Sequence, residues 1–285
     1  MQIDSADRAA RRHARRNLAA SLALAALAAL GVPAPATAQA SDEEWLEDCR
    51  DQRGGRLERH CAVQVHRVAA TGAPVRVDGH LNGAVEVVGW DGGHIEVHLR
   101  VVARAETEAE ARALAEQVRF AASGTSLSVD GPRHTRDANW HASFVLFVPA
   151  SSDLDIETIN GPLSVRGVSG RMDLSTQNGP LSLRDVSGDV RARTQNGPLT
   201  VRLTGSTWSG AGLDAEALNG PATLYVPDGY SANLETGTIN GPLSSDVPLT
   251  VTRLSRNSHI DTVLGSGGPR VRVVTTNGPL SIRRG

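Results

Sequence analysis

The tripeptide Asn-Gly-Pro occurs six times in the second half of the chain, and its spacing is the strongest constraint on the fold. The intervals between copies are 18, 18, 23, 21 and 37 residues, and we interpret the last as two repeats of which one has lost its marker. A period of about 20 residues is typical of solenoids, in which each repeat buries its apolar face against its neighbours. We therefore expect a stack of similar coils from Leu154 onward. The markers begin at Asn160, Asn178, Asn196, Asn219, Asn240 and Asn277.

Each coil divides into two halves, as in Asn160–Val168 followed by Ser169–Gln177. One half begins with Asn-Gly-Pro and the other with Ser-Gly, which indicates two short strands and two turns per coil. Asn and Gly suit tight corners, and Pro, which lacks an N–H, suits the first residue of a strand. The predicted fold class is all-β: a single-stranded right-handed β-solenoid with short two-strand coils.

One α-helix is expected to interrupt the strands, over about residues 107–122. Thr107 and Glu110 have the spacing of a capping box, in which each side chain satisfies a free backbone N–H. Ala111, Leu114 and Val118 then fall on one narrow apolar stripe. Alternating valines from residue 62 onward predict strands before this helix. The segment 81–87 parallels residues 159–165, so we expect a degenerate coil there.

The first forty residues have the pattern of a Sec signal peptide, with a basic start, an apolar run from Leu18 to Leu30 and small residues up to Ala40. The run is too short to span a membrane, so we expect no transmembrane segment after its removal. The predicted location is periplasmic, cell-surface or secreted. The segment 1–40 holds five of the 29 basic and two of the 31 acidic residues, which leaves a net charge of −5. This acidic balance argues against nucleic acid as a partner.

Cys49 and Cys61 are the only cysteines. In an oxidising compartment two thiols at this separation are expected to form a disulfide, which would stabilise the fold by about 3 kcal/mol. The highly charged residues around them predict a solvated segment over residues 41–73, tethered by that bond. The solenoid domain is expected to cover residues 74–285.

Polar side chains recur at one offset after successive Asn-Gly-Pro corners. Because side chains alternate along a strand, Leu163 and Val165 are expected to point inward, and the residues between and after them outward. Guanidinium groups on stacked strands lie about 5 Å apart and bind carboxylates or phosphates bidentately. We predict a binding row for an anionic glycan or a cell-envelope protein, the alternative being a solvated row without a ligand. Its members are Arg166, Arg184, Arg202, Ser164, Ser182 and Thr200.

The corner asparagines are expected to be structural. Asn side chains at one position of stacked strands bond to one another, as in other cross-β stacks. We therefore predict a turn ladder of Asn160, Asn178, Asn196, Asn219, Asn240 and Asn277, and no ligand bound by it.

Metal and catalytic signatures are weak in this sequence. His94 and His98 share a strand face, but no Cys, Asp or Glu completes a familiar spacing, so no metal and no cofactor are predicted. The carboxylate pairs Asp153/Asp155 and Asp185/Asp189 keep a polysaccharide-active β-helix enzyme as an alternative. The short coils offer no long loops to build a cleft, and no Gly-x-Ser-x-Gly or His-Glu-x-x-His pattern occurs. We expect a protein that is not an enzyme.

Two segments, Val87-Val-Gly-Trp-Asp91 and Leu154-Asp-Ile-Glu-Thr-Ile-Asn-Gly161, resemble the bacterial DUF4097 family, which carries the label adhesin. The resemblance covers about residues 74–285. It implies an exported, single-stranded right-handed β-solenoid without established catalytic residues. We expect a non-enzymatic adhesin-like protein that presents a repetitive face. The alternative is a self-assembling structural or envelope-stress-associated protein, a homo-oligomer through the C-terminal solenoid edge, because Ile282–Gly285 ends the chain without a capping helix.

Overall fold

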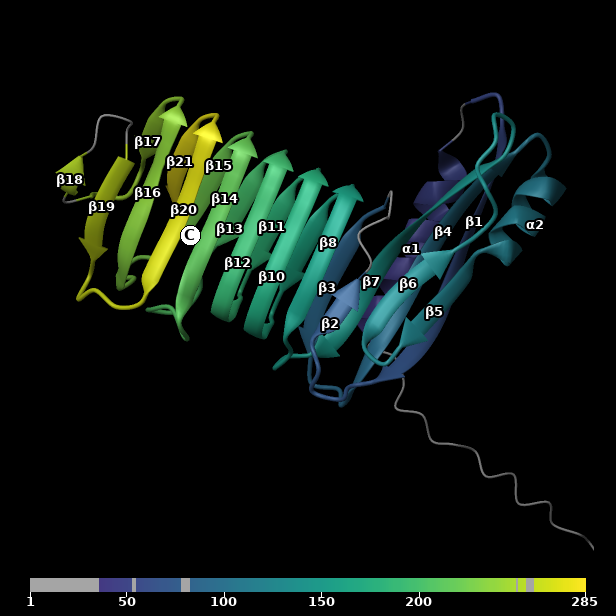
Figure 1. Cartoon of the computed structure of the whole chain (residues 1–285), viewed down its shortest axis with the longest axis horizontal. Helices are drawn as coiled ribbons and strands as arrows, with labels where there is room; N and C mark the ends of the chain where they lie inside the picture. The colour runs from purple at the N-terminus through teal and green to yellow at the C-terminus, as the bar shows by residue number, and fades with distance from the viewer. Residues whose placement is uncertain (1–35, 53–54, 78–82, 250, 255–258) are drawn as a thin grey trace, which may run out of the picture.

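The computed structural model describes residues 36–52, 55–77, 83–249, 251–254 and 259–285. Most of the predicted signal peptide lies outside these residues. Within them, no helix is both long enough and apolar enough to cross a bilayer. The chain is predominantly β-structure, as predicted, with a helical region at one end (Figure 1).

The helices and strands follow one another in a regular order. Before the Asn-Gly-Pro coils lie α1 (Ala36–Asp51), β1 (Glu58–Ala69), β2 (Val75–Val77), β3 (Val85–Trp90), β4 (His94–Ala105), α2 (Glu108–Gln117), β5 (Arg119–Ser123), β6 (Ser126–Asp130) and β7 (Asn139–Pro149). The coils contain β8 (Leu154–Asn160), β9 (Leu163–Arg166), β10 (Ser169–Asn178), β11 (Leu181–Arg184), β12 (Ser187–Asn196), β13 (Leu199–Arg202), β14 (Gly212–Asn219) and β15 (Ala222–Val226). The remaining strands are β16 (Ala232–Asn240), β17 (Leu243–Ser245), β18 (Val251–Leu254), β19 (His259–Leu264), β20 (Arg270–Asn277) and β21 (Leu280–Arg284).

These strands form two large sheets. One sheet has the order β1-β4-β7-β3-β9-β11-β13-β15-β21-β17, and the other has the order β18-β19-β16-β20-β14-β12-β10-β8-β2-β6-β5. From β8 to β17 successive strands alternate between the sheets, and each coil pairs in parallel with its neighbours. Figure 1 shows the resulting row of stacked coils. This arrangement is consistent with the predicted two-strand solenoid.

The core lies between the two sheets. Leu163 and Val165 are each 1% exposed, as the alternation predicted, and the coil above places Leu181 and Leu183 directly against them. Val85 and Val87 on β3 align with Leu163 and Val165 on β9, as the predicted early coil requires, although residues 81–82 of the predicted segment 81–87 lie outside the described residues.

The corners are built from close backbone contacts between coils. A Cβ atom on Gly179 would lie 2.1 Å from the carbonyl oxygen of Gly161, so only glycine fits there. Two residues before the Asn, Thr176 donates a hydrogen bond to the Gly161 carbonyl over 3.2 Å, and Thr194 donates to the Gly179 carbonyl over 2.9 Å. The corner signature is therefore Thr-x-Asn-Gly-Pro in these coils, and the role of its buried threonine was not predicted.

The last coil in the sequence is not the last coil in space. β20 lies between β14 and β16, and β21 lies between β15 and β17. The prediction that Ile282–Gly285 forms the uncovered edge of the solenoid is wrong, and the argument for a homo-oligomer through that edge falls with it. The interval of 37 residues is likewise not two coils in series, because it includes the antiparallel pair β18 and β19.

Helix α2 has the predicted capping box. The Thr107 hydroxyl accepts a hydrogen bond from the Glu110 N–H, and the Glu110 carboxylate accepts one from the Thr107 N–H over 3.1 Å. The helix ends at Gln117 rather than at residue 122 as predicted. Val118 has extended backbone angles, and Arg119–Ser123 forms strand β5, which pairs with β6.

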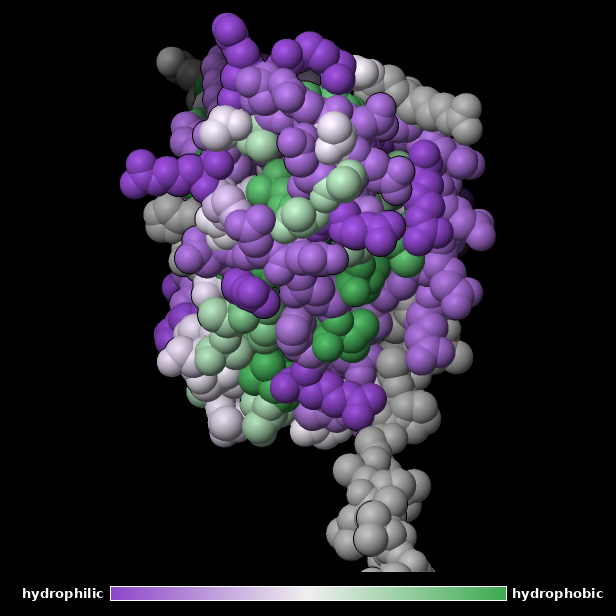
Figure 2. Space-filling model, turned by 90° about the vertical axis from the view of Figure 1, so that its right-hand side faces the viewer, coloured by the Kyte–Doolittle hydropathy of each residue, from purple (hydrophilic) through white to green (hydrophobic). Residues whose placement is uncertain are grey.

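A second helix, α1, was not predicted. Trp45 and Leu46 of α1 pack against Val102 of β4, and the predicted Cys49–Cys61 disulfide joins α1 to β1. The segment expected to be solvated thus covers one face of a sheet, while the domain limits at residues 41 and 74 stay predictions. Figure 2 shows the end of the molecule that carries α2 and β5 as mostly hydrophilic with separate hydrophobic patches, as a capped end of a repeat stack requires.

Candidate functional site

The predicted polar row lies on three adjacent strands of one sheet. Arg184 on β11 is in register with Arg166 on β9 and Arg202 on β13, and the hydroxyl residues two positions earlier are in register in the same way. Alternate residues of these strands are buried, so the row faces outward. We call this surface the Ser/Arg face, and it consists of Ser164, Ser182, Thr200, Arg166, Arg184 and Arg202.

The three guanidinium groups of the Ser/Arg face have different neighbours. Arg166 Nε lies 3.5 Å from Glu86 Oε1, and the guanidinium carbon of Arg202 lies 3.9 Å from the centroid of the Tyr225 ring. Arg184 is exposed, and within the described residues it has no ion-pair partner. The centre of the row therefore offers a free cation between two that are held in place.

The row ends at Tyr225. This residue occupies the next position beyond Arg202 and separates it from Arg283, which the sequence places at the same offset. Arg283 pairs instead with Asp246 over 2.9 Å. The Ser/Arg face is thus limited to three successive coils, with an acidic residue at one side and an aromatic ring at the other.

The outer face of the other sheet has a different charge pattern. One row across its strands combines acidic and basic residues that lie in register, and many of them pair with each other. Arg272 Nη1 lies 2.6 Å from Asp214 Oδ1, and Arg272 Nε lies 3.1 Å from Glu235 Oε1. Much of the charge on this face is therefore neutralised by ion pairs between its own residues. The row runs through Asp155, Asp173, Arg191, Asp214, Arg272, Glu235 and Asp261.

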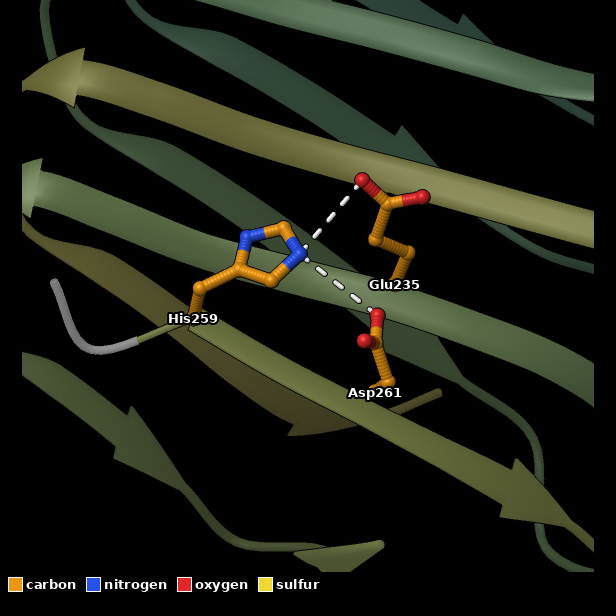
Figure 3. A group of neighbouring side chains, drawn as sticks. All are labelled: Glu235, His259 and Asp261. Carbon is orange, nitrogen blue, oxygen red and sulfur yellow. Dashed lines mark ion pairs between the residues drawn. The ribbon is translucent and has the colours of Figure 1, made fainter. Parts of the chain in front are cut away.

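Three potential ligand side chains meet at the end of that row. Glu235 on β16 and His259 and Asp261 on β19 point toward one another in Figure 3. Burial of Glu235 favours its neutral form, but hydrogen bonds and charge from Arg270 and Arg272 outweigh this effect and lower the pKa of the carboxyl group. This cluster was not predicted, although the pattern His259-x-Asp261 places two ligand types on one strand face.

His98, one of the two histidines weighed for metal binding, lies in a buried polar network. His98 Nε2 lies 2.9 Å from Glu96 Oε1, and its Nδ1 contacts Asp42 of α1. Arg100 Nε donates to Asp42 Oδ1 over 2.9 Å. Glu96 and His98 are almost fully buried, so this network holds α1 on β4.

The carboxylate pairs and the corner asparagines also have defined partners. Asp155 accepts a hydrogen bond from Arg76 over 2.9 Å, and Asp185 accepts one from Thr204 over 2.7 Å. The corner amides bond in series: from Asn178 onward, each Nδ2 donates to the Oδ1 of the preceding asparagine in the stack over 2.8–3.0 Å. In space the order of the ladder is Asn160, Asn178, Asn196, Asn219, Asn277 and Asn240.

Stacked coils with polar outer faces define this chain as a β-rich repeat scaffold. The family model described as Toastrack DUF4097 matches residues 111–283, and the chain belongs to this family. No curated protein matches the chain.

Solved structures that resemble it have low identity. A putative cell adhesion protein from Clostridium sporogenes aligns with a TM-score of 0.46 and 9% identity, over 79% of this chain and 100% of that one. A putative adhesin from Bacteroides fragilis aligns with a TM-score of 0.39 and 9% identity, over 79% and 97% of the two chains. A putative lipid binding protein from Parabacteroides distasonis aligns with a TM-score of 0.30 and 8% identity, over 78% and 96%.

Proposed function

We propose that the protein is an exported, non-enzymatic, adhesin-like protein whose Ser/Arg face binds an anionic surface glycan. The observation that carries this proposal is the register of Arg166, Arg184 and Arg202 on adjacent parallel strands, with Arg184 free of ion pairs among the described residues. Because such strands lie about 4.8 Å apart, the three guanidinium groups present a short linear array of positive charge.

A polymer that lies along the stack direction fits this array. Each of the three coils offers one guanidinium group and one hydroxyl group, two residues apart on the same strand. Guanidinium groups bind carboxylates with two parallel hydrogen bonds, and the hydroxyl groups of Ser164, Ser182 and Thr200 can bond to sugar hydroxyls. A carboxylate-bearing polysaccharide is therefore the ligand class that the face suits best.

Export is supported by two features. The signal-peptide pattern of residues 1–40 lies at the start of the chain, and Cys49 and Cys61 form a disulfide, which persists in oxidising compartments. We propose a periplasmic, cell-surface or secreted location on this basis.

Charge reversal on matched faces tests the binding site. The variant Arg166→Glu/Arg184→Glu/Arg202→Glu is compared with Arg171→Glu/Arg191→Glu/Arg193→Glu, which makes the same charge change on the outer face of the opposite sheet. Binding to immobilised polygalacturonate is expected to be lost in the first variant and to be largely retained in the second. Equal binding by both variants would contradict the proposal.

Two controls make this comparison interpretable. The unfolding midpoint of each variant shows that lost binding is not lost folding, and a milder triple replacement by Gln removes the charge without reversing it.

The polymer recovered after incubation is expected to keep its chain length. Shortening of the polymer would contradict the non-enzymatic part of the proposal.

A further inference from the structure

Glu235, His259 and Asp261 are brought together by the pairing of two strands at the end of one sheet. β16 and β19 pair antiparallel, with Glu235 directly opposite Asp261. His259 lies opposite Gly237, which has no side chain, so the imidazole has room to lie toward Glu235. Figure 3 shows the three side chains converging from the two strands.

The distances between these groups suit coordination of a metal better than hydrogen bonding. His259 Nε2 lies 3.4 Å from Glu235 Oε1 and 3.5 Å from Asp261 Oδ1. Both are longer than the usual N–H···O distance of about 2.9–3.0 Å. Tetrahedral zinc, with bonds of about 2.0–2.2 Å to nitrogen and oxygen, holds its ligand atoms about 3.3–3.5 Å apart. All three ligand atoms lie within 4.8 Å of one another, so a small movement of the carboxylates closes the site.

Arginines behind Glu235 hold its carboxylate in position. Arg270 Nε donates to Glu235 Oε2 over 2.9 Å, and Arg272 Nε donates to Oε1 over 3.1 Å. The second lone pair of Oε1 is left available to coordinate a metal ion. Carboxylates that bind metal ions are commonly oriented by such outer hydrogen bonds.

The charge around the site favours a divalent cation. Arg272 is shared with Asp214 and Glu216, whose carboxylates lie 2.6 Å and 3.6 Å from its Nη1. The ion-paired cluster of these residues with Glu235, Asp261 and Arg270 therefore contains more carboxylates than guanidinium groups. A divalent ion bound between the His259 imidazole and the two carboxylates would balance the excess negative charge.

We propose that Glu235, His259 and Asp261 bind one divalent transition-metal ion, with Zn²⁺ as the best match. One imidazole and two carboxylates form a donor set that suits zinc, whereas calcium requires six or more oxygen ligands. The side chains are 23%, 32% and 45% exposed for Glu235, His259 and Asp261, so water reaches the site. The fourth position is therefore open to solvent or to an anionic ligand. Bound metal would also link β19 to β16 at the end of the sheet.

Calorimetric titration of the purified protein without a polyhistidine tag tests this site. Zn²⁺ is expected to bind with a stoichiometry of one, Co²⁺ to give the visible spectrum of a four-coordinate site, and excess Ca²⁺ not to displace either. His259→Asn and Glu235→Gln are each expected to weaken Zn²⁺ binding by about ten-fold or more, since even outer-shell changes cost about 10–100-fold.

His134→Asn is the matched control, because it removes an exposed histidine that lies beside Trp140, far along the chain from the proposed ligands. It is expected to leave the affinity and stoichiometry unchanged. Circular dichroism confirms that each variant is folded, and Glu235→Gln keeps the side-chain shape. Absence of a Zn²⁺ isotherm, or an unchanged one in both His259→Asn and Glu235→Gln, would overturn the proposal.

Discussion

Removal of one amide from the middle of the corner ladder is expected to destabilise the protein more than removal of one at its end. Asn178 lies in the middle: its Nδ2 donates to Asn160 Oδ1 over 2.9 Å, and its Oδ1 accepts from Asn196 Nδ2 over 2.9 Å. Asn240 is the last amide of the ladder in space, and it donates to Asn277 over 2.8 Å. Asn178→Ala therefore removes two ladder bonds, whereas Asn240→Ala removes one.

The magnitude follows from the number of bonds. A hydrogen bond contributes about 0.5–1.5 kcal/mol net to stability, so Asn178→Ala is expected to cost about 1–3 kcal/mol and Asn240→Ala about half of that. The groups left behind are at the surface, where water satisfies them, which places both values in the lower part of their ranges. The ratio of the two losses is therefore a sharper test than either value alone.

Urea denaturation followed by circular dichroism measures both variants against the wild type. Asn178→Ala should lower the free energy of unfolding by about twice as much as Asn240→Ala, with similar denaturant slopes. Both variants should bind the glycan as the wild type does, because the corners are structural. Equal losses in the two variants, or a loss of glycan binding without a loss of stability, would refute the reasoning.

Three other perturbations have defined outcomes. Reduction of the Cys49–Cys61 disulfide, which closes a separation of 12 residues, should lower stability by about 3 kcal/mol; an unchanged urea midpoint in reductant would argue against it. The pKa of His141 is lowered from its usual 6.5 by burial and then by nearby cations, so its contribution to stability is full above pH 6.5 and is lost as the pH falls below that value. In thermal melts at a series of pH values, His141→Gln should reduce the loss of stability as the pH falls below 6.5. An unchanged dependence of stability on pH would contradict the role given to His141. Gly179→Ala should lower the free energy of unfolding by about 1–3 kcal/mol, because the new Cβ would lie 2.1 Å from the Gly161 carbonyl oxygen. An unfolding midpoint equal to that of the wild type would show that the corner relaxes around the new methyl group.

The coil architecture could be predicted because its determinants are local. Asn, Gly and Pro define each corner, and the alternation of Leu163, Ser164, Val165 and Arg166 defines which side chains face the core. The spatial order of the final coils could not be predicted in the same way. The corners at Asn219, Asn240 and Asn277 have the same local sequence, so local sequence does not determine which coils stack next to each other. Only the packing of the whole stack places β20 between β14 and β16.

The two candidate sites also differ in how far the sequence could predict them. The Ser/Arg face could be read from the sequence because its residues recur at one offset in consecutive coils. The Glu235 cluster depends on the antiparallel pairing of β16 with β19, which the repeat pattern of the sequence does not indicate. Helix α1 likewise depends on a distant contact, since Asp42 of this charged segment reaches His98 and Arg100 on β4.

Protection of individual arginines from chemical modification tests the proposed binding face most directly. The folded protein is treated with phenylglyoxal with and without polygalacturonate, and the modified arginines are identified by mass spectrometry. Arg184 is exposed and without an ion pair among the described residues, so it should react readily alone and be protected by the polymer. Arg191 and Arg193, on the opposite sheet, should react equally in both samples. Protection of Arg191 and Arg193 while Arg184 stays reactive would contradict the account.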